Sequence, residues 1–462
     1  MLDAPVKIIV PVGSLGAGVR EAELAYGIAQ GASAIATDAG STDSGAAYLA
    51  LGISKNNRGS VQRDLRLLMT AARDAGIPLI LGTCGQAGGD RNLDWTRDIV
   101  LEVAEEIGYR PRIAVMYSEQ DKSELKRRNA QGDIQPLPPL GALADDTIDA
   151  CDHIVAAMGA EPYIAALESG ADIILGGRTT DTAVIASYAL LKGAPAGPAW
   201  HAAKISECGA QCAAEPTNGS GVLISIDNDG FSVEPLTQTN HCTPHSVSAH
   251  MLYENSDPFR LVEPGGVLDV TDAVYEQADA RSVRVTGSRW ETRPYTMKLE
   301  GAGTAGYQTV MLIGIQDPEV LGRLNEFHDN MLAVLYERVR STMGLSDDDF
   351  HISLRIYGWN AVTGETPPAG TPAPREVGIL FVATAADQET ASQIAKACNP
   401  YFFHFPINLG DELPSYGFAF SPADIDRGPV FEFKLNHVVA IDDPLELVRT
   451  DWIDLGATEA AQ

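Results

Sequence analysis

The chain has 462 residues, of which 45% are hydrophobic, and its 62 acidic and 33 basic side chains give a formal charge of −29 at neutral pH. This length exceeds what one ordinary core organises, so we expect two or three domains. The negative charge repels phosphate backbones and anionic lipid headgroups, which argues against nucleic acid and membrane partners.

The N-terminal segment and the distribution of apolar residues predict a cytoplasmic protein. MLDAPVKIIVPVG lacks a basic region followed by a long apolar stretch and a small-residue cleavage site. No apolar run approaches the ~20 residues that a bilayer-spanning helix needs. The six cysteines are scattered along the chain, unlike those of a disulfide scaffold, so we expect reduced thiols.

Residues 1–200 alternate apolar, strand-like runs with amphipathic stretches, beginning with KIIVPVG, REAELAYGIAQG and SAIATDAG. This βαβ rhythm predicts an α/β domain, a three-layer fold whose parallel sheet carries helices on both faces. One helix is expected around Val61 to Ala75, because apolar residues recur there about every 3.6 positions and Gly76 before Pro78 ends it.

The pattern changes after residue 200. Residues 201–345 are predicted to form an α+β domain, in which GVLISIDNDGFSVEPL carries a hairpin motif and DPEVLGRLNEFHDNMLAVLYERVRSTMG reads as the final helix. Residues 346–445 follow a β, β, α, β order, which predicts a small ferredoxin-like domain. Residues 446–462 are predicted to be a tail.

Chemistry is expected in the loops that follow the parallel strands, because ligands of such sheets bind beyond the carboxyl ends of the strands. The first of these loops, VGSLGAG, contains Gly13, Ser14 and Gly16. Its glycines would let backbone amides approach an oxyanion at a helix N-terminus, although a plain tight turn is the commoner reason for such glycines. The sequence matches neither a Walker loop nor G-x-G-x-x-G. We predict substrate contacts from these three residues.

The second loop, TDAGSTDSG, holds more polar side chains than a helix cap needs. One Asp or Ser would satisfy the free amides of the following helix. The loop holds five such side chains, so we predict that at least one carboxylate faces a ligand; they are Asp38, Ser41, Thr42, Asp43 and Ser44.

Two further strand-end loops extend this polar set. GTCGQAGGDRN contains Gln86 and Cys84. A helix dipole could lower the pKa of the Cys84 thiol, but a cysteine at a strand end is more often a small buried residue. GGRTTDT contains Thr179, Thr180, Asp181 and Arg178. A guanidinium group binds a carboxylate through two hydrogen bonds, so Arg178 is the predicted anchor of an anionic substrate.

The segment NHCTPHSVSAH gathers His241, Cys242, His245 and His250. Imidazole and thiolate ligands can form a zinc site, but the usual zinc spacings are absent, and acid/base, substrate-contact or surface roles remain open. Cys208 and Cys212 have no matching distant pair, so we expect no zinc there.

The stretches GADIILGGRTTDTA and NHCTPHSVSAHMLYENSDPFRLVEPGGVLDVTDAVYEQADARSVRVTGSRW resemble the acyclic terpene utilisation protein (AtuA) family. The resemblance covers roughly Lys7 to Met343. It implies a part in the catabolism of branched acyclic terpenoids and other carboxylic acids, and a small ferredoxin-like C-terminal domain.

These observations lead to one main functional hypothesis, a catabolic lyase or hydratase acting on a small or branched carboxylic acid or its CoA thioester. Asp43 or Asp181 would be the base, Arg178 the anchor, and the amides of the glycine loop the oxyanion donors. His245 is a further catalytic candidate. Apolar content and a metabolic family favour a homo-oligomer.

Two alternatives remain open at this stage. One is a metal-assisted hydrolase or isomerase that uses His241 and His245. The other is a noncatalytic ligand-binding or assembly subunit that works with a partner polypeptide. The main hypothesis assigns no metal ligands, and the sequence does not identify a cofactor.

Overall fold

The computed structural model describes residues 1–216, 219–368, 370–408 and 410–457. The chain divides into two compact units. The first comprises Met1–Gly303 together with the chain from Phe433 onward, and the second is Thr304–Glu432.

The first unit is built on a ten-stranded mixed sheet. Its centre is parallel, because five strands that alternate with helices along the chain lie side by side with the same direction. In spatial order these strands are β1 (Val6–Val10), β2 (Ala34–Asp38), β3 (Leu79–Gly82), β7 (Ile173–Gly176) and β4 (Arg112–Tyr117).

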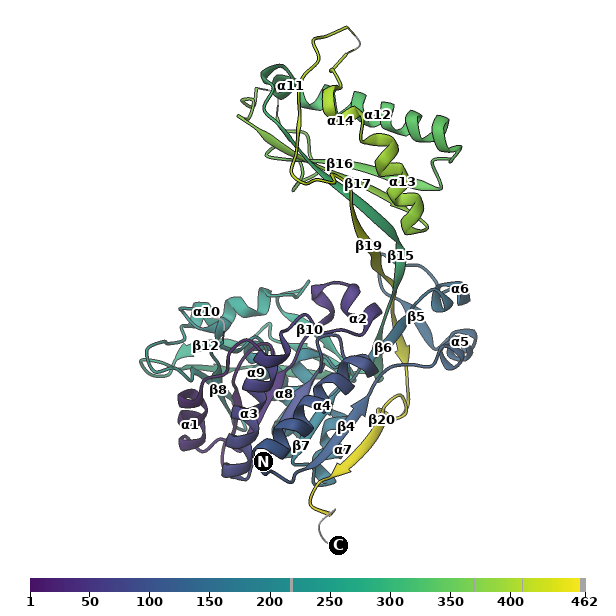
Figure 1. The fold of residues 1–462 in the computed structure, drawn as a ribbon. Coiled ribbons are helices and arrows are strands. Elements are labelled where there is room, and N and C mark those ends of the chain that lie inside the picture. The colour runs from purple at the N-terminus through teal and green to yellow at the C-terminus, as the bar shows by residue number, and fades with distance from the viewer. Residues whose placement is uncertain (217–218, 369, 409, 458–462) are drawn as a thin grey trace. The chain divides into compact units, whose positions relative to one another are not determined.

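Antiparallel strands extend the sheet at both edges. The hairpin β8 (Val222–Ile226) and β9 (Gly230–Pro235) pairs with β1, and its turn is closed by Asp227, whose carboxylate accepts from the amides of Asp229 and Gly230. This is the predicted hairpin. Beyond it lie β13 (Val283–Thr286) and β12 (Val274–Gln277). At the other edge β20 (Arg449–Asp454) runs along β4 (Figure 1).

The two faces of the central sheet bury separate cores, because successive strand residues point to opposite sides. Ile9 belongs to one core and Ile8 to the other. The Ile9 core includes residues of α1 (Glu21–Ala29), α3 (Arg58–Ala75) and α4 (Asp90–Glu106). The Ile8 core includes residues of α7 (Glu161–Glu168), α8 (Asp181–Leu191) and α9 (Ala196–Ser206). Strands buried on both faces explain the continuous apolar runs of the sequence.

The remaining elements of the first unit are short. The helices are α2 (Ala47–Leu51), α5 (Lys122–Gln131), α6 (Asp145–Asp149) and α10 (Pro244–Ala249), with 3₁₀ turns η1 (Thr42–Ser44), η2 (Gly209–Cys212) and η3 (His250–Leu252). The strands are β5 (Ile134–Pro136), β6 (His153–Ala157) and a three-stranded sheet of β10 (Arg260–Glu263), β11 (Gly266–Asp269) and β14 (Arg289–Thr292).

The second unit has a core of its own around Phe327, Phe381 and Phe402. Its strands lie in the order β16-β17-β15-β19. The strands are β15 (Thr296–Ile315), β16 (Phe350–Tyr357), β17 (Val377–Ala385), β18 (Gly417–Phe418) and β19 (Ile425–Ala440). The helices are α11 (Pro318–Gly322), α12 (Leu324–Met343), α13 (Gln388–Cys398) and α14 (Tyr401–His404).

The fold is therefore mixed α/β, as predicted at that level, but the units differ from the predicted boundaries at 200, 345 and 445. The physical reason is the length of β15 and β19. Each of these strands continues through a unit boundary, so no turn or linker residues mark the division in the sequence.

The predicted tail, residues 446–462, contains a strand, because residues 449–454 form β20. Residues 458–462 of that tail lie outside the described residues. Within the described part of the chain, no helix is both long and apolar enough to cross a membrane.

Candidate functional site

A cavity of about 310 Å³ lies in the first unit at the carboxyl ends of the parallel strands. The loops that follow β1, β2 and β3 line it, together with the first residue of α8 and the segment that follows α9. The lining residues are Gly13, Ser14, Ala17, Asp38, Gly40, Ser41, Asp43, Ser44, Lys55, Gln86, Asp181, Glu207, Cys208, Gln211, Gly219, Ser220, Tyr253 and Glu254. We call this cavity the strand-end pocket.

The wall of the strand-end pocket is acidic. Five carboxyl side chains line it, and Lys55 is the basic side chain among its lining residues. The Lys55 ammonium donates to Ser44 Oγ at 2.6 Å. Such a wall repels a free carboxylate and favours a neutral or cationic group in the cavity. The carboxyl residues are Asp38, Asp43, Asp181, Glu207 and Glu254.

Asp38 is the most deeply buried of the predicted carboxyl candidates. It ends β2, is 5% exposed, and its Oδ1 has no hydrogen-bond partner among the described residues. Burial, and then the neighbouring charge of Asp181, raise the pKa of Asp38 well above its usual range. A carboxyl group in this environment favours its protonated form and can donate a proton into the pocket.

Asp181 faces the same pocket from the first turn of α8, with a different environment. Its Oδ1 accepts from Arg178 Nη1 at 3.3 Å. Burial raises the pKa of Asp181 and the Arg178 charge opposes that rise. Because the guanidinium supports the ionised form, Asp181 is better suited than Asp38 to accept a proton.

Arg178, the predicted substrate anchor, does not line the pocket. It is buried, its Nε donates to Glu300 Oε2 at 2.7 Å, and its Nη1 donates to the carbonyl of Thr179 at 2.8 Å. Burial alone would raise the pKa of Glu300, but the charges of Arg178 and Lys298 lower it to about 2. The guanidinium therefore already holds a carboxylate of the protein itself.

The glycine loop is also occupied by a protein carboxylate. Asp64 of α3, which is fully buried, accepts from the amides of Gly16 and Gly18 at 3.0 Å each and from Val19 at 2.9 Å. Gly13 and Ser14 line the pocket, whereas Gly16 does not. The amides that would bind a phosphate therefore donate instead to an aspartate of the neighbouring helix.

The other predicted contacts divide between the pocket and the core. Gln86 and Ser41 line the pocket, and Gln86 Nε2 donates to the Ser41 carbonyl at 2.9 Å while its Oε1 has no partner within the described chain. Thr42 points away, donating to Glu300 Oε1 at 3.1 Å. Cys84 is fully buried, and burial raises the pKa of its thiol, so it is not an activated nucleophile.

Thr179 and Thr180 do not line the pocket either. Thr179 Oγ1 lies 2.7 Å from the hydroxyl of Tyr163 and donates to the Gly177 carbonyl at 3.0 Å. Thr180 occupies the N-cap position of α8. Both threonines therefore support the loop that presents Asp181.

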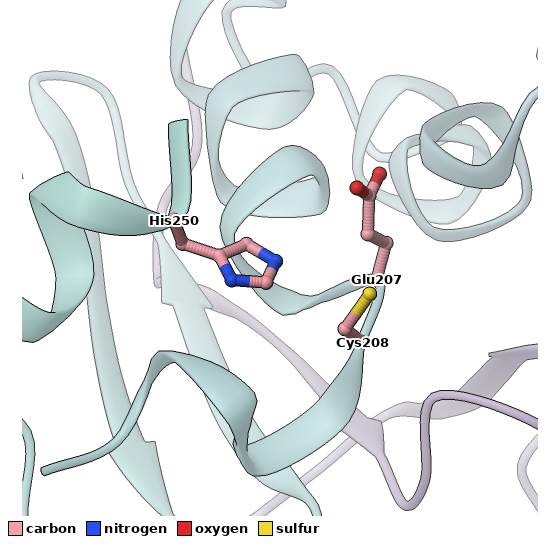
Figure 2. Close-up of side chains that lie close together, drawn as sticks. All are labelled: Glu207, Cys208 and His250. Carbon is pink, nitrogen blue, oxygen red and sulfur yellow. The ribbon is translucent and has the colours of Figure 1, made fainter. Parts of the chain in front are cut away.

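The histidine segment is arranged differently from the predicted cluster. His241 and His245 are exposed, and neither belongs to the pocket or to the groups of described residues that could hold a metal ion. His250 from the same segment is buried and lies with Glu207 and Cys208 (Figure 2). A second group comprises Asp43, Asp181 and Glu254.

Sequence reasoning missed Glu207 and Glu254 because neither follows a strand of the parallel sheet. One sign was available for Glu207. The helix AGPAWHAAKIS is mostly apolar and is buried on every side, and charged residues in and directly after such a helix need a partner or a function. Lys204 and Glu207 are both buried and form an ion pair of 2.5 Å.

The fold and the pocket define an α/β protein with a cavity at the strand ends of its sheet, the place where ligands of such sheets bind. Residues 59–414 match the model of the acyclic terpene utilisation family protein AtuA. The match covers most of the chain, which therefore belongs to the AtuA family, as the sequence motifs predicted. No curated protein and no solved structure matches the chain.

Proposed function

We propose that the chain is a lyase of the hydratase type, which acts in acyclic terpene utilisation on the acyl thioester of a small or branched acid. The family name supports the metabolic setting. The observation that carries the reaction type is Asp38, a buried carboxyl group with an unpartnered oxygen in a pocket that Asp181 also lines.

A dehydration needs a base at one carbon and an acid at the next. Asp181 would take the proton beside the thioester carbonyl, while Asp38 gives its proton to the departing hydroxyl group. The carbon–oxygen bond breaks, a carbon–carbon double bond forms, and water leaves. Solvent then returns the proton from Asp181 to Asp38. Ser14 Oγ, buried and without a partner among the described residues, would donate to the carbonyl oxygen as charge develops there.

The acidic wall supports one of the two predicted substrate classes, the thioester, over the free acid. A free acid would bring a carboxylate to five carboxyl side chains with Lys55 as the basic lining residue, whereas the reacting end of a thioester is neutral. We therefore propose the thioester, with Arg178 held by Glu300 rather than available to the substrate.

The test starts from a ligand and continues with turnover. Thermal-shift screening against branched 3-hydroxyacyl and enoyl thioesters and their free acids should raise the melting temperature for thioesters only. With the best ligand, Asp38→Asn and Asp181→Asn should each lower turnover by about 10²–10⁴-fold, the usual contribution of acid/base catalysis. Asp229→Asn, an exposed turn variant, is the control. Unchanged turnover in both pocket variants would refute the assignment.

The remaining expectations are proposals of the same kind. The strand order β16-β17-β15-β19, with β17 antiparallel to both β16 and β15, supports a ferredoxin-like class for the second unit. The two cores on the faces of the parallel strands support a three-layer class for the first unit. A homo-oligomer would show in light scattering as a molar mass that is a multiple of the mass of one chain.

The noncatalytic alternative predicts a protein that is inactive alone and active when co-purified with a partner.

A further inference from the structure

Three side chains with metal-binding atoms converge at one edge of the strand-end pocket. Glu207 and Cys208 directly follow α9, and His250 comes from the segment after α10. One ligand atom of each residue lies within 4.8 Å of the others. Figure 2 shows the His250 imidazole directed toward Cys208 and Glu207.

His250 supplies an independent reason to place a ligand here. The residue is 5% exposed, and its Nε2 has no hydrogen-bond partner among the described residues. A buried polar atom without a partner loses its hydrogen bonds to water and gains none in return, so native proteins nearly always satisfy such atoms. The ring is held in place by stacking on Tyr253, with 5.4 Å between the ring centres. A metal ion would satisfy this nitrogen.

The ion pair beside the cluster orients the carboxylate. Lys204 Nζ donates to Glu207 Oε1 at 2.5 Å and to the Tyr253 carbonyl at 3.0 Å. This leaves Glu207 Oε2 for a metal ion, in the way that outer hydrogen bonds fix metal-binding side chains elsewhere. The positive charge of Lys204 is offset by the other carboxyl side chains of the pocket.

We propose that Glu207, Cys208 and His250 bind a zinc-like divalent transition metal ion at the edge of the strand-end pocket. Thiolate, imidazole and carboxylate are the ligands that zinc takes in proteins, and three protein ligands with an open position are typical of catalytic rather than structural sites. Glu207 and Cys208 line the pocket and His250 does not, so the open position faces the cavity. This binding does not depend on the hydratase assignment.

The test measures metal directly. The full chain is stripped with a chelator, dialysed and titrated with Zn²⁺ or Co²⁺. Elemental analysis should find one zinc ion per chain, and the cobalt form should show a thiolate-to-metal charge-transfer band. Cys208→Ser should abolish that band. His250→Ala should weaken binding by more than the roughly 10–100-fold that loss of an outer partner costs.

Matched controls separate the site from general damage. His245→Ala changes an exposed histidine of the same segment, and Cys398→Ser changes a cysteine of the second unit, so both should bind zinc normally. Alkylation of the unaltered chain adds a readout without any variant, because zinc should protect Cys208 from iodoacetamide. Any of three results would overturn the proposal. These are the absence of stoichiometric zinc, zinc binding that is unchanged in both Cys208→Ser and His250→Ala, and labelling of Cys208 in the zinc form.

Discussion

The ion pair of Arg178 and Glu300 buries two charges that need each other for stability. Both side chains are buried, and the partners are 122 residues apart in the chain. Glu300→Gln removes the closer of the two carboxylates that pair with the guanidinium and leaves Asp181 at 3.3 Å, so we expect the free energy of unfolding to fall by about 3–5 kcal/mol. Urea unfolding followed by circular dichroism measures this. Glu291→Gln, in an exposed pair with Arg260, should leave the unfolding curve unchanged.

The Glu300 carboxylate also makes the folding stability depend on pH. The pKa of Glu300 lies at about 2 in the folded chain against an ordinary value of 4.5. Its contribution to stability is therefore present above pH 4.5 and is lost as the pH falls toward 2, by about 3 kcal/mol in total. Unfolding at a series of acidic pH values should show this loss in the native chain and a smaller one in Glu300→Gln. Equal pH dependence in both would contradict it.

Asp38 should contribute a pH dependence of stability opposite to that of Glu300. Burial and the charge of Asp181 raise its folded pKa above the ordinary 3.8, so its contribution is complete below that pH and is lost as the pH rises through the folded value. Asp38→Asn, which cannot ionise, should therefore gain stability relative to the native chain as the pH increases. Paired melting curves at a series of pH values from about 3.8 upward measure the difference, and a gap that stays constant over the whole series would count against a raised pKa.

At the scale of the elements, the pocket depends on how closely its loops approach. A Cβ added at Gly40 would lie 2.5 Å from the Cα of Gln86, so the loops after β2 and β3 touch backbone to backbone. Gly40→Ala should cost about 1–3 kcal/mol, as overpacking usually does, and should displace Asp38 and Gln86 from the cavity. Ligand binding in the thermal-shift assay should disappear. Gly141→Ala, where an added Cβ meets nothing within 4 Å, is the control.

The elements also show what sequence patterns can and cannot predict. The helix Arg58–Ala75 and the hairpin at Asp227 follow from local periodicity and turn chemistry, so they were predictable. The loops of Asp38 and Asp181 could be chosen from the sequence because both follow strands of the parallel sheet, and both residues line the strand-end pocket. The hydrogen-bond partners of the glycine loop and of Arg178 were not predictable from the sequence. Asp64 accepts from the loop amides and Glu300 pairs with Arg178, and both contacts join segments that are far apart in the chain.

For the whole molecule, separate cores predict separate unfolding. The second unit buries Phe327 in a cluster drawn from residues of that unit. Phe327→Ala should destabilise this unit by about 3–5 kcal/mol and leave the first unit unaffected. Differential scanning calorimetry should therefore show one of two transitions moving to lower temperature. Val362→Ala, an exposed change in the same unit, should move neither. A single transition that shifts as a whole would show that the units unfold together.

The pairing of β20 with β4 has a consequence for synthesis on the ribosome. Residues 112–117 emerge long before residues 449–454, so the sheet of the first unit keeps an open edge during almost all of translation. The second unit is a continuous segment, and the ribosome has added all of its residues before it reaches β20. The inserted unit is therefore the first that can fold to completion. A nascent chain halted before residue 449 would expose β4 as a template for strands of other chains.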